Sequence, residues 1–246
     1  MTPVDTYEII EFEGVSGILL APESGGHGFV AVRHSADEPS WSDSGTHVHA
    51  RSDEIYLLLK GRLDLIVAGG SISLSPGEML LVRAGIPHGV VGGAGPIEHI
   101  GFRAPALDDR DTGPTLPGSV PLQPGEWGHH ISLREPEARN CWLLGVGAAR
   151  FHSPHLLLAY LDFPMQAEAV AGLGTRLQMH AHRASWEHYL CLRGSKTLIV
   201  EGDIVEIHPG QMLVVAPGAR HNVIDRRAPY AGFTFRAPIL DDKVPG

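Results

Sequence analysis

Histidine is the residue type with the clearest capacity for chemistry here, with 15 copies among 246 residues. His47 and His49 stand two residues apart, Glu54 follows them, and His88 lies further along the chain. Residues i and i+2 of a strand face the same side, so the first two imidazoles share one face. Because Glu54 is seven residues from His47, a turn or bulge must bring its carboxylate to that face. Three neutral imidazoles and one carboxylate suit a divalent transition metal (Fe, Mn, Ni, Zn, Co or Cu), and they leave coordination positions open.

The same four residue types recur 133 positions later, which indicates an internal duplication. A gapless comparison of 47–109 with 180–242 gives 28 identities in 63 positions. The second copy repeats the predicted metal ligands as His180, His182, Glu187 and His221. We therefore expect up to one metal per copy, because a duplicated module can keep its ligands while only one copy carries out chemistry.

The duplication also predicts the domain organisation. The segment between the copies, residues 110–128, is rich in proline and glycine and has no apolar period, which is typical of a linker. We predict one domain over 1–112, a linker over 113–127 and a second domain over 128–246.

Short strands separated by turn residues must position these side chains. We predict a strand over 54–60 that ends at Gly61, then a hairpin of 63–67 with 71–74 around a glycine pair. An apolar strand follows at 79–82, and the second copy repeats the pattern. Such spacing predicts an all-β sandwich or barrel.

Two motifs in each copy resemble those of the cupin superfamily. The first, G-x5-H-x-H-x3,4-E-x6-G, is complete in the second copy, whereas Trp41 replaces its leading glycine in the first. Its residues in the second copy are Gly174, His180, His182, Glu187 and Gly194. The second motif, G-x5-P-x-G-x2-H-x3-N, keeps its glycines and histidine in both copies, but Arg83 and Ala216 replace its proline.

The resemblance covers nearly the whole chain and implies a bicupin, that is, two tandem cupin barrels of the double-stranded β-helix or jelly-roll type. It is specific for the fold and not for the reaction, because cupins include dioxygenases, decarboxylases, isomerases, aminohydrolases and proteins without catalytic activity.

Three further residues are candidates for catalysis or substrate contact. Alternation from the glutamates points Tyr56 and Tyr189 into their barrels, where they either take part in catalysis or pack with satisfied hydroxyls. Arg83 stands near a predicted barrel mouth and could contact an anionic substrate.

Composition restricts the partners. A formal charge of −9 disfavours nucleic acid, and no apolar run reaches the roughly 20 residues of a membrane span. The two cysteines, Cys141 and Cys191, make no disulfide framework, and the N-terminus has no secretory pattern. We expect a cytoplasmic protein with a small-molecule substrate, and a homo-oligomer is compatible with the sequence.

The favoured function is a metal-dependent dioxygenase that acts on a small polar or carbonyl-containing molecule. One alternative is a metal-dependent isomerase, decarboxylase or aminohydrolase that uses no oxygen. Another is a bicupin that binds a small ligand without turnover.

Overall fold

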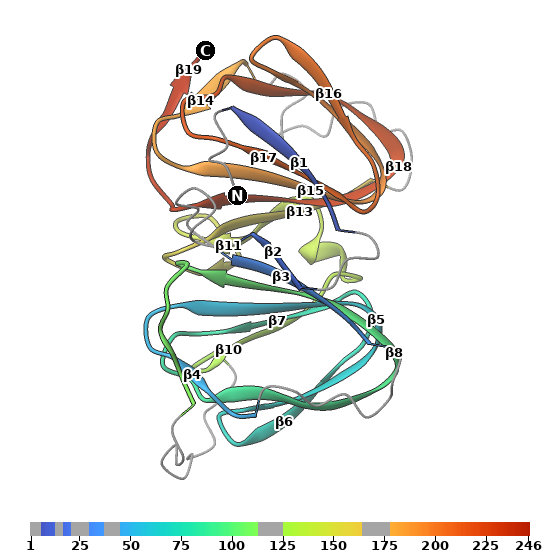
Figure 1. Ribbon diagram of the computed structural model, residues 1–246, viewed down its shortest axis with the longest axis vertical. Helices are drawn as coiled ribbons and strands as arrows, with labels where there is room; N and C mark the ends of the chain where they lie inside the picture. Colours follow the sequence, from blue (N-terminus) through green and yellow to red (C-terminus); the bar gives the residue numbers. More distant parts are fainter. Residues whose placement is uncertain (1–5, 13–16, 21–29, 37–44, 113–124, 164–177) are drawn as a thin grey trace. The chain divides into compact units, whose positions relative to one another are not determined.

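The computed structural model describes residues 6–12, 17–20, 30–36, 45–112, 125–163 and 178–246. Strands dominate these ranges, and their only helical element is the short 3-10 helix η2, Pro136–Ala138. The chain forms two compact units, and the strands of each are shown in Figure 1. The all-β prediction is therefore confirmed.

The first unit is built on a seven-stranded sheet in the order β10-β7-β5-β8-β3-β2, with β6 paired to β5 and a separate β4–β9 pair. These strands are β2 Gly17–Leu20, β3 Val30–Ala36, β4 Val48–His49, β5 Asp53–Val67, β6 Gly70–Leu74, β7 Glu78–Val82, β8 His88–Ala104, β9 Arg110–Asp111 and β10 Gly128–Ser132.

The second unit is built on a ten-stranded sheet in the order β1-β17-β15-β18-β13-β11-β12, to which β14, β16 and β19 also pair. These strands are β1 Tyr7–Glu11, β11 Cys141–Gly145, β12 Phe151–His152, β13 Leu157–Phe163, β14 His180–His182, β15 Trp186–Val200, β16 Asp203–Ile207, β17 Gln211–Val215, β18 His221–Ala237 and β19 Lys243–Pro245.

The sheets divide the chain differently from the sequence prediction at two strands. Strand β1, placed by the sequence in the first domain, pairs with β17 of the second unit. Strand β10, placed in the second domain, pairs with β7 of the first unit. Neither unit is therefore a continuous segment like the predicted 1–112 and 128–246. Most of the predicted linker, 113–127, lies outside the described residues.

Long, curved strands form the frame of each unit (Figure 1). The predicted end of a strand at Gly61 is wrong, because β5 continues through it to Val67. Gly61 has φ of 78°, and a Cβ there would lie 2.5 Å from the carbonyl oxygen of Pro96. The glycine therefore permits a bulged, bent strand instead of a turn. Gly194 plays the same part in β15, with φ of 76°.

Side chains that alternate along these strands form an apolar core inside each barrel. The first core includes Tyr56, Leu58, Leu63, Leu65, Val67, Leu80, Val82 and Ile97. The second includes Tyr189, Cys191, Leu198, Val200, Leu213, Val215 and Tyr230. Among the described residues, no helix has the length and hydropathy needed to span a bilayer.

Candidate metal centres

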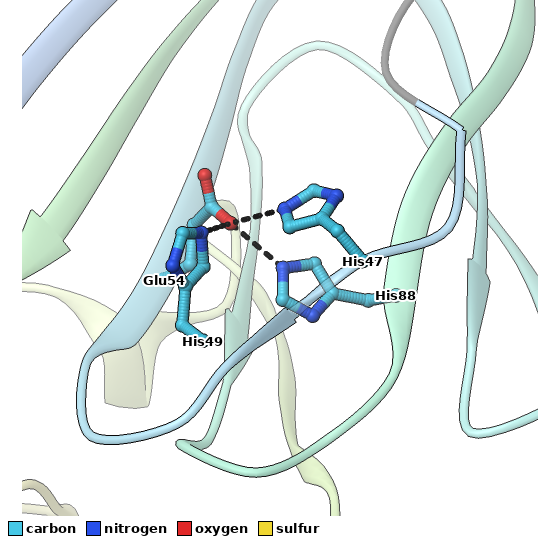
Figure 2. A group of neighbouring side chains, drawn as sticks. All are labelled: His47, His49, Glu54 and His88. Atoms are coloured by element: carbon cyan, nitrogen blue, oxygen red, sulfur yellow. Dashed lines mark hydrogen bonds and ion pairs between the residues drawn. The ribbon is translucent and has the colours of Figure 1, made fainter. Parts of the chain in front are cut away.

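In the first barrel, backbone pairing brings together histidines that are far apart in sequence. His47 and His88 form an antiparallel bridge in which the amide of each donates to the carbonyl of the other, at 2.8 and 2.9 Å. Their side chains therefore share one face, and His49 follows two residues later on the same face. Glu54 reaches this face from β5, and Figure 2 shows the four side chains converging.

The three imidazole nitrogens of this cluster gather around a single carboxylate oxygen. Glu54 Oε2 lies 3.3 Å from His47 Nε2, 3.2 Å from His49 Nε2 and 2.7 Å from His88 Nε2. One donor atom from each of the four residues lies within 4.8 Å of the other three. The three histidines are buried. The structure thus brings together all four ligands predicted for the first copy.

The second barrel repeats this arrangement. His180 pairs with His221 across β14 and β18, as His47 pairs with His88. Glu187 Oε2 lies 3.7 Å from His180 Nε2, 3.2 Å from His182 Nε2 and 2.8 Å from His221 Nε2. All four residues are buried, and their donor atoms again lie within 4.8 Å of one another.

The outer nitrogens of the imidazoles determine which tautomer each ring adopts. In both clusters every Nδ1 lies near a carbonyl or a carboxylate, which only accept hydrogen bonds, although guanidinium nitrogens of Arg110 and Arg236 also lie 3.5 Å from Nδ1 of His47 and His182. A ring that binds a metal through Nε2 would carry its proton on Nδ1 and donate it to such an acceptor. The first-barrel acceptors are Gly45 O, Asp109 Oδ1 and Ile86 O, at 3.4, 3.1 and 2.7 Å. The second-barrel acceptors are Gln178 O, Asp242 Oδ1 and Ala219 O, at 3.0, 3.1 and 2.9 Å. In a neutral ring of that tautomer the Nε2 lone pair points into the cluster.

Asp109 and Asp242 orient the middle histidine of each cluster. Asp109 accepts from the backbone amides of Arg51 and Ser52, at 2.8 and 2.9 Å, and from His49 Nδ1. Asp242 accepts from the amides of Ala184 and Ser185 and from His182. These bonds hold the turn between the histidine pair and the glutamate. A carboxylate behind a histidine is the usual outer partner of a metal ligand.

The charges and lone pairs of both clusters favour a cation at the centre. Burial would raise the pKa of Glu54, but hydrogen bonds from its three histidines outweigh burial and hold that pKa well below its usual range. The same balance lowers the pKa of Glu187. Burial would lower the pKa of His221, but its bond to Glu187 raises it. Inward lone pairs and an ionised carboxylate would repel each other without a proton or a metal between them, so each cluster could bind a divalent ion.

Both predicted tyrosines lie beside the clusters. The ring centroids of Tyr56 and His88 are 6.2 Å apart, and Tyr189 lies at the same distance from His221. Both tyrosines are buried among apolar side chains and form part of the cores of their barrels. Their catalytic role stays a prediction. No described contact joins Arg83 to the first cluster, and its backbone amide donates to the Trp127 carbonyl at 2.9 Å.

Three polar residues inside the second barrel were not predicted from the sequence. Lys196 is fully buried, although its counterpart 133 positions earlier is the apolar Leu63. Arg226 is paired with Lys196 across β15 and β18. Tyr230 is also fully buried. The signal that could have revealed them was a charged residue that interrupts an inward apolar column in one copy only.

Comparison with known proteins identifies the family. A family model for the cupin domain matches residues 34–97 and again residues 170–227. The chain belongs to the cupin superfamily and is a bicupin, with one cupin barrel from each copy. Among curated proteins, none matches this sequence.

Solved structures share the fold across nearly the whole chain. Protein Ylba from E. coli is 10% identical, with a TM-score of 0.62, and the match covers 99% of this chain and 96% of that one. Salicylate 1,2-dioxygenase from Pseudaminobacter salicylatoxidans is 12% identical, with a TM-score of 0.63 and coverage of 96% and 85%. A cupin 2 conserved barrel domain protein from Leptotrichia buccalis is 11% identical, with a TM-score of 0.57 and coverage of 97% and 100%. At these identities the likeness establishes the fold.

Proposed function

We propose that this bicupin is a metal-dependent dioxygenase that acts on a small polar or carbonyl-containing organic molecule. The observation that carries the proposal is the buried cluster of three histidines and one glutamate in each barrel. In the first barrel His47, His49, Glu54 and His88 would hold the metal, and in the second His180, His182, Glu187 and His221 would do so. A redox-active divalent ion held there supplies Lewis acidity and electron transfer toward O₂.

Charge and hydrogen bonding at the second cluster favour the binding of a substrate oxygen. Glu187 brings one negative charge, and its three histidines bind in the neutral form, so a divalent ion keeps a net positive charge that attracts an anionic oxygen. Burial, together with the negative charge of Glu187 and a hydrogen bond to that carboxylate, raises the pKa of Tyr189 well above its usual value. Tyr189 therefore stays protonated, and once Glu187 binds a metal its hydroxyl could turn from that carboxylate and donate to a substrate oxygen.

Oxygen consumption tests this proposal. The protein is loaded separately with Fe, Mn, Ni and Cu and offered enols, diketones, dihydroxyaromatics and salicylate, which the structurally similar dioxygenase is named for. We expect oxygen uptake with at least one pair of metal and substrate. We also expect that at least one of the variants His180→Ala and His47→Ala loses this uptake. The absence of uptake from every pair would reject the dioxygenase.

One observation favours a second function, a metal-assisted reaction without oxygen. Burial, with Arg226 nearby, holds the pKa of Lys196 well below its usual value. A buried amine whose pKa is lowered is suited to proton transfer in an isomerisation, decarboxylation or aminohydrolysis. Turnover under strictly anaerobic conditions would identify this class, whereas a dioxygenase stops when O₂ is removed.

A further inference from the structure

The second barrel holds two basic side chains that face each other. Lys196 on β15 and Arg226 on β18 are direct partners in the register of the two strands, so their side chains share the inner face. The Lys196 side chain is fully buried, and its Nζ lies 4.5 Å from the ring centroid of Tyr189 and 5.4 Å from that of Tyr230. The Arg226 guanidinium lies over the Phe163 ring, at 5.8 Å. Like charges in this position repel each other.

Nothing among the described residues neutralises these cations. Lys196 Nζ has a 3.4 Å hydrogen bond to the Thr234 hydroxyl, and no described carboxylate forms an ion pair with Lys196 or Arg226. Asp225 is exposed and accepts from the backbone amide of Arg226, while Glu187 is already bound by three histidines. Lysine is rarely buried without a partner, because desolvation of an unpaired charge is strongly unfavourable.

Two polar atoms at this place, one on Arg226 and one on a neighbouring tyrosine, have no hydrogen-bond partner in the part of the chain that the structure describes. They are the hydroxyl of the fully buried Tyr230 and Nε of Arg226. Buried polar atoms in folded proteins are nearly always satisfied, so unsatisfied donors that gather at one place indicate a missing acceptor. Two cations and a phenol match the donor needs of a carboxylate.

The first barrel lacks this arrangement, although it has the same metal cluster. The positions equivalent to Lys196, Arg226, Tyr230 and Thr234 are Leu63, Gly93, Ile97 and Gly101. The donors are therefore not needed to build a cupin barrel or to hold its ligands. They distinguish the second barrel chemically from the first.

The donors also lie close to the second metal cluster. The Tyr189 ring, which Lys196 covers, is 6.2 Å from the His221 ring. We infer that Lys196 and Arg226, with Tyr230, form a subsite for the carboxylate of a small organic substrate in the second barrel. This inference rests on the proposed function, because the ligand is a substrate only if the protein is an enzyme. It places turnover in the second barrel and gives the substrate a carboxylate.

Calorimetric titration of the full chain with acetate, benzoate and neutral benzamide tests the subsite. Chelator-treated protein should bind at least one of the two carboxylates and should not bind benzamide. Lys196→Met and Arg226→Gln should each weaken carboxylate binding at least about tenfold, because each removes a charge-assisted hydrogen bond. Arg227→Gln is the matched control, because it removes the same charge from an exposed neighbouring residue and should bind like the parent protein.

Several outcomes would overturn the inference: neither carboxylate binds, benzamide binds equally well, or both variants bind like the parent. Thermal unfolding shows whether each variant folds. If Lys196→Met does not fold, the carboxylate affinity of Arg226→Gln alone tests the subsite. His180→Ala lacks a predicted metal ligand and should still bind the carboxylate. Carboxylate binding without oxygen uptake would reject the dioxygenase and leave the subsite standing, so the two failures can be distinguished.

Discussion

Asp242 Oδ1 lies 3.1 Å from Nδ1 of His182, and Asp109 repeats this contact with His49 at the same distance. Burial would raise the pKa of Asp242, but its bonds to the amides of Ala184 and Ser185 and to His182 lower it to about 2. The carboxylate therefore stays charged and fixes the proton of His182 on Nδ1. The lone pair on Nε2 then points at the cluster, so Asp242 is a positioning residue and not a ligand.

Replacing this carboxylate should weaken metal binding without removing a ligand. Asp242→Asn should lower the metal affinity of the second cluster by about 10–100-fold, because the ring loses the partner that sets its tautomer. Competition with a zinc-binding dye measures the affinity. Asp241→Asn, the exposed neighbour, removes the same charge and should have no effect. Equal affinities for Asp242→Asn and the parent would contradict the positioning role.

Metal content should report the two clusters separately. Protein purified without chelators should carry up to two ions per chain, and His47→Ala or His180→Ala should each remove the ion of its own barrel, because each loses one of four donors. Elemental analysis of the parent, both single variants and the double variant measures this. His208→Ala, a histidine outside both clusters, is the control. Unchanged metal content in the double variant would reject both sites.

The metal-free protein should show the charges of the second cluster in its pH dependence. The lowered pKa of Glu187 contributes stability that is present above about pH 4.5 and is lost as pH falls through the folded pKa. The raised pKa of His221 contributes stability that is present below about pH 6.5 and is lost as pH rises through the folded pKa. The difference in unfolding free energy between the parent and Glu187→Gln should therefore shrink at both extremes. Urea unfolding of chelator-treated protein measures it, and a constant difference from pH 3 to pH 9 would contradict the pairing.

The ligands could be predicted from sequence because their spacing survives duplication. A His-x-His pair, a following glutamate and a distant histidine recur at one offset, and the structure needs that same spacing for His180 to pair with His221. The exchange of β1 and β10 could not be predicted in this way. Whether an edge strand pairs within its own barrel or with the other depends on contacts distant in sequence, and β1 lies outside the compared segments.

The buried polar residues of the second barrel could not be predicted from the repeat. Identities between the copies reveal what the fold and the metal cluster require, and Asp109 and Asp242 were visible among them. Lys196 lies at a position where the two copies differ, so a comparison that counts identities gives no information about it. Lys196 follows the bulge of β15 at Gly194, where the sequence pattern predicts the end of a strand instead.

That bend depends on a glycine. Gly194→Ala should destabilise the protein by at least about 2 kcal/mol, because φ of 76° is strained for alanine and the new Cβ would come within 2.5 Å of backbone oxygens of Arg227 and Pro229. Gly202→Ala is the control for backbone strain alone: its φ is 96°, but no atom lies within 4 Å of the added Cβ, so it should lose only about 1 kcal/mol. Urea unfolding compares them, and equal losses would show that the close approach is unimportant.

Lys196 should reduce the stability of the ligand-free protein. Burial first, and then the charge of Arg226, lower its pKa, while Glu187 and Cys191 act in the opposite direction; the other polar groups against it are Tyr189, Tyr230 and Thr234. The unfolded chain keeps the lysine proton up to about pH 10.5, so the parent gains stability as pH rises from the folded pKa toward that value.

Lys196→Met removes this penalty and should stabilise the chelator-treated protein by about 1–3 kcal/mol near pH 7, with a smaller gain at pH 10. Leu63 at the equivalent position shows that a barrel of this kind accommodates an apolar side chain there. Lys60→Met, on the exposed surface of β5, is the control and should change stability by less than about 0.5 kcal/mol at either pH. Stability and carboxylate binding should therefore change in opposite directions in Lys196→Met. A variant that lost stability at pH 7 would show instead that the buried amine is part of the packed core.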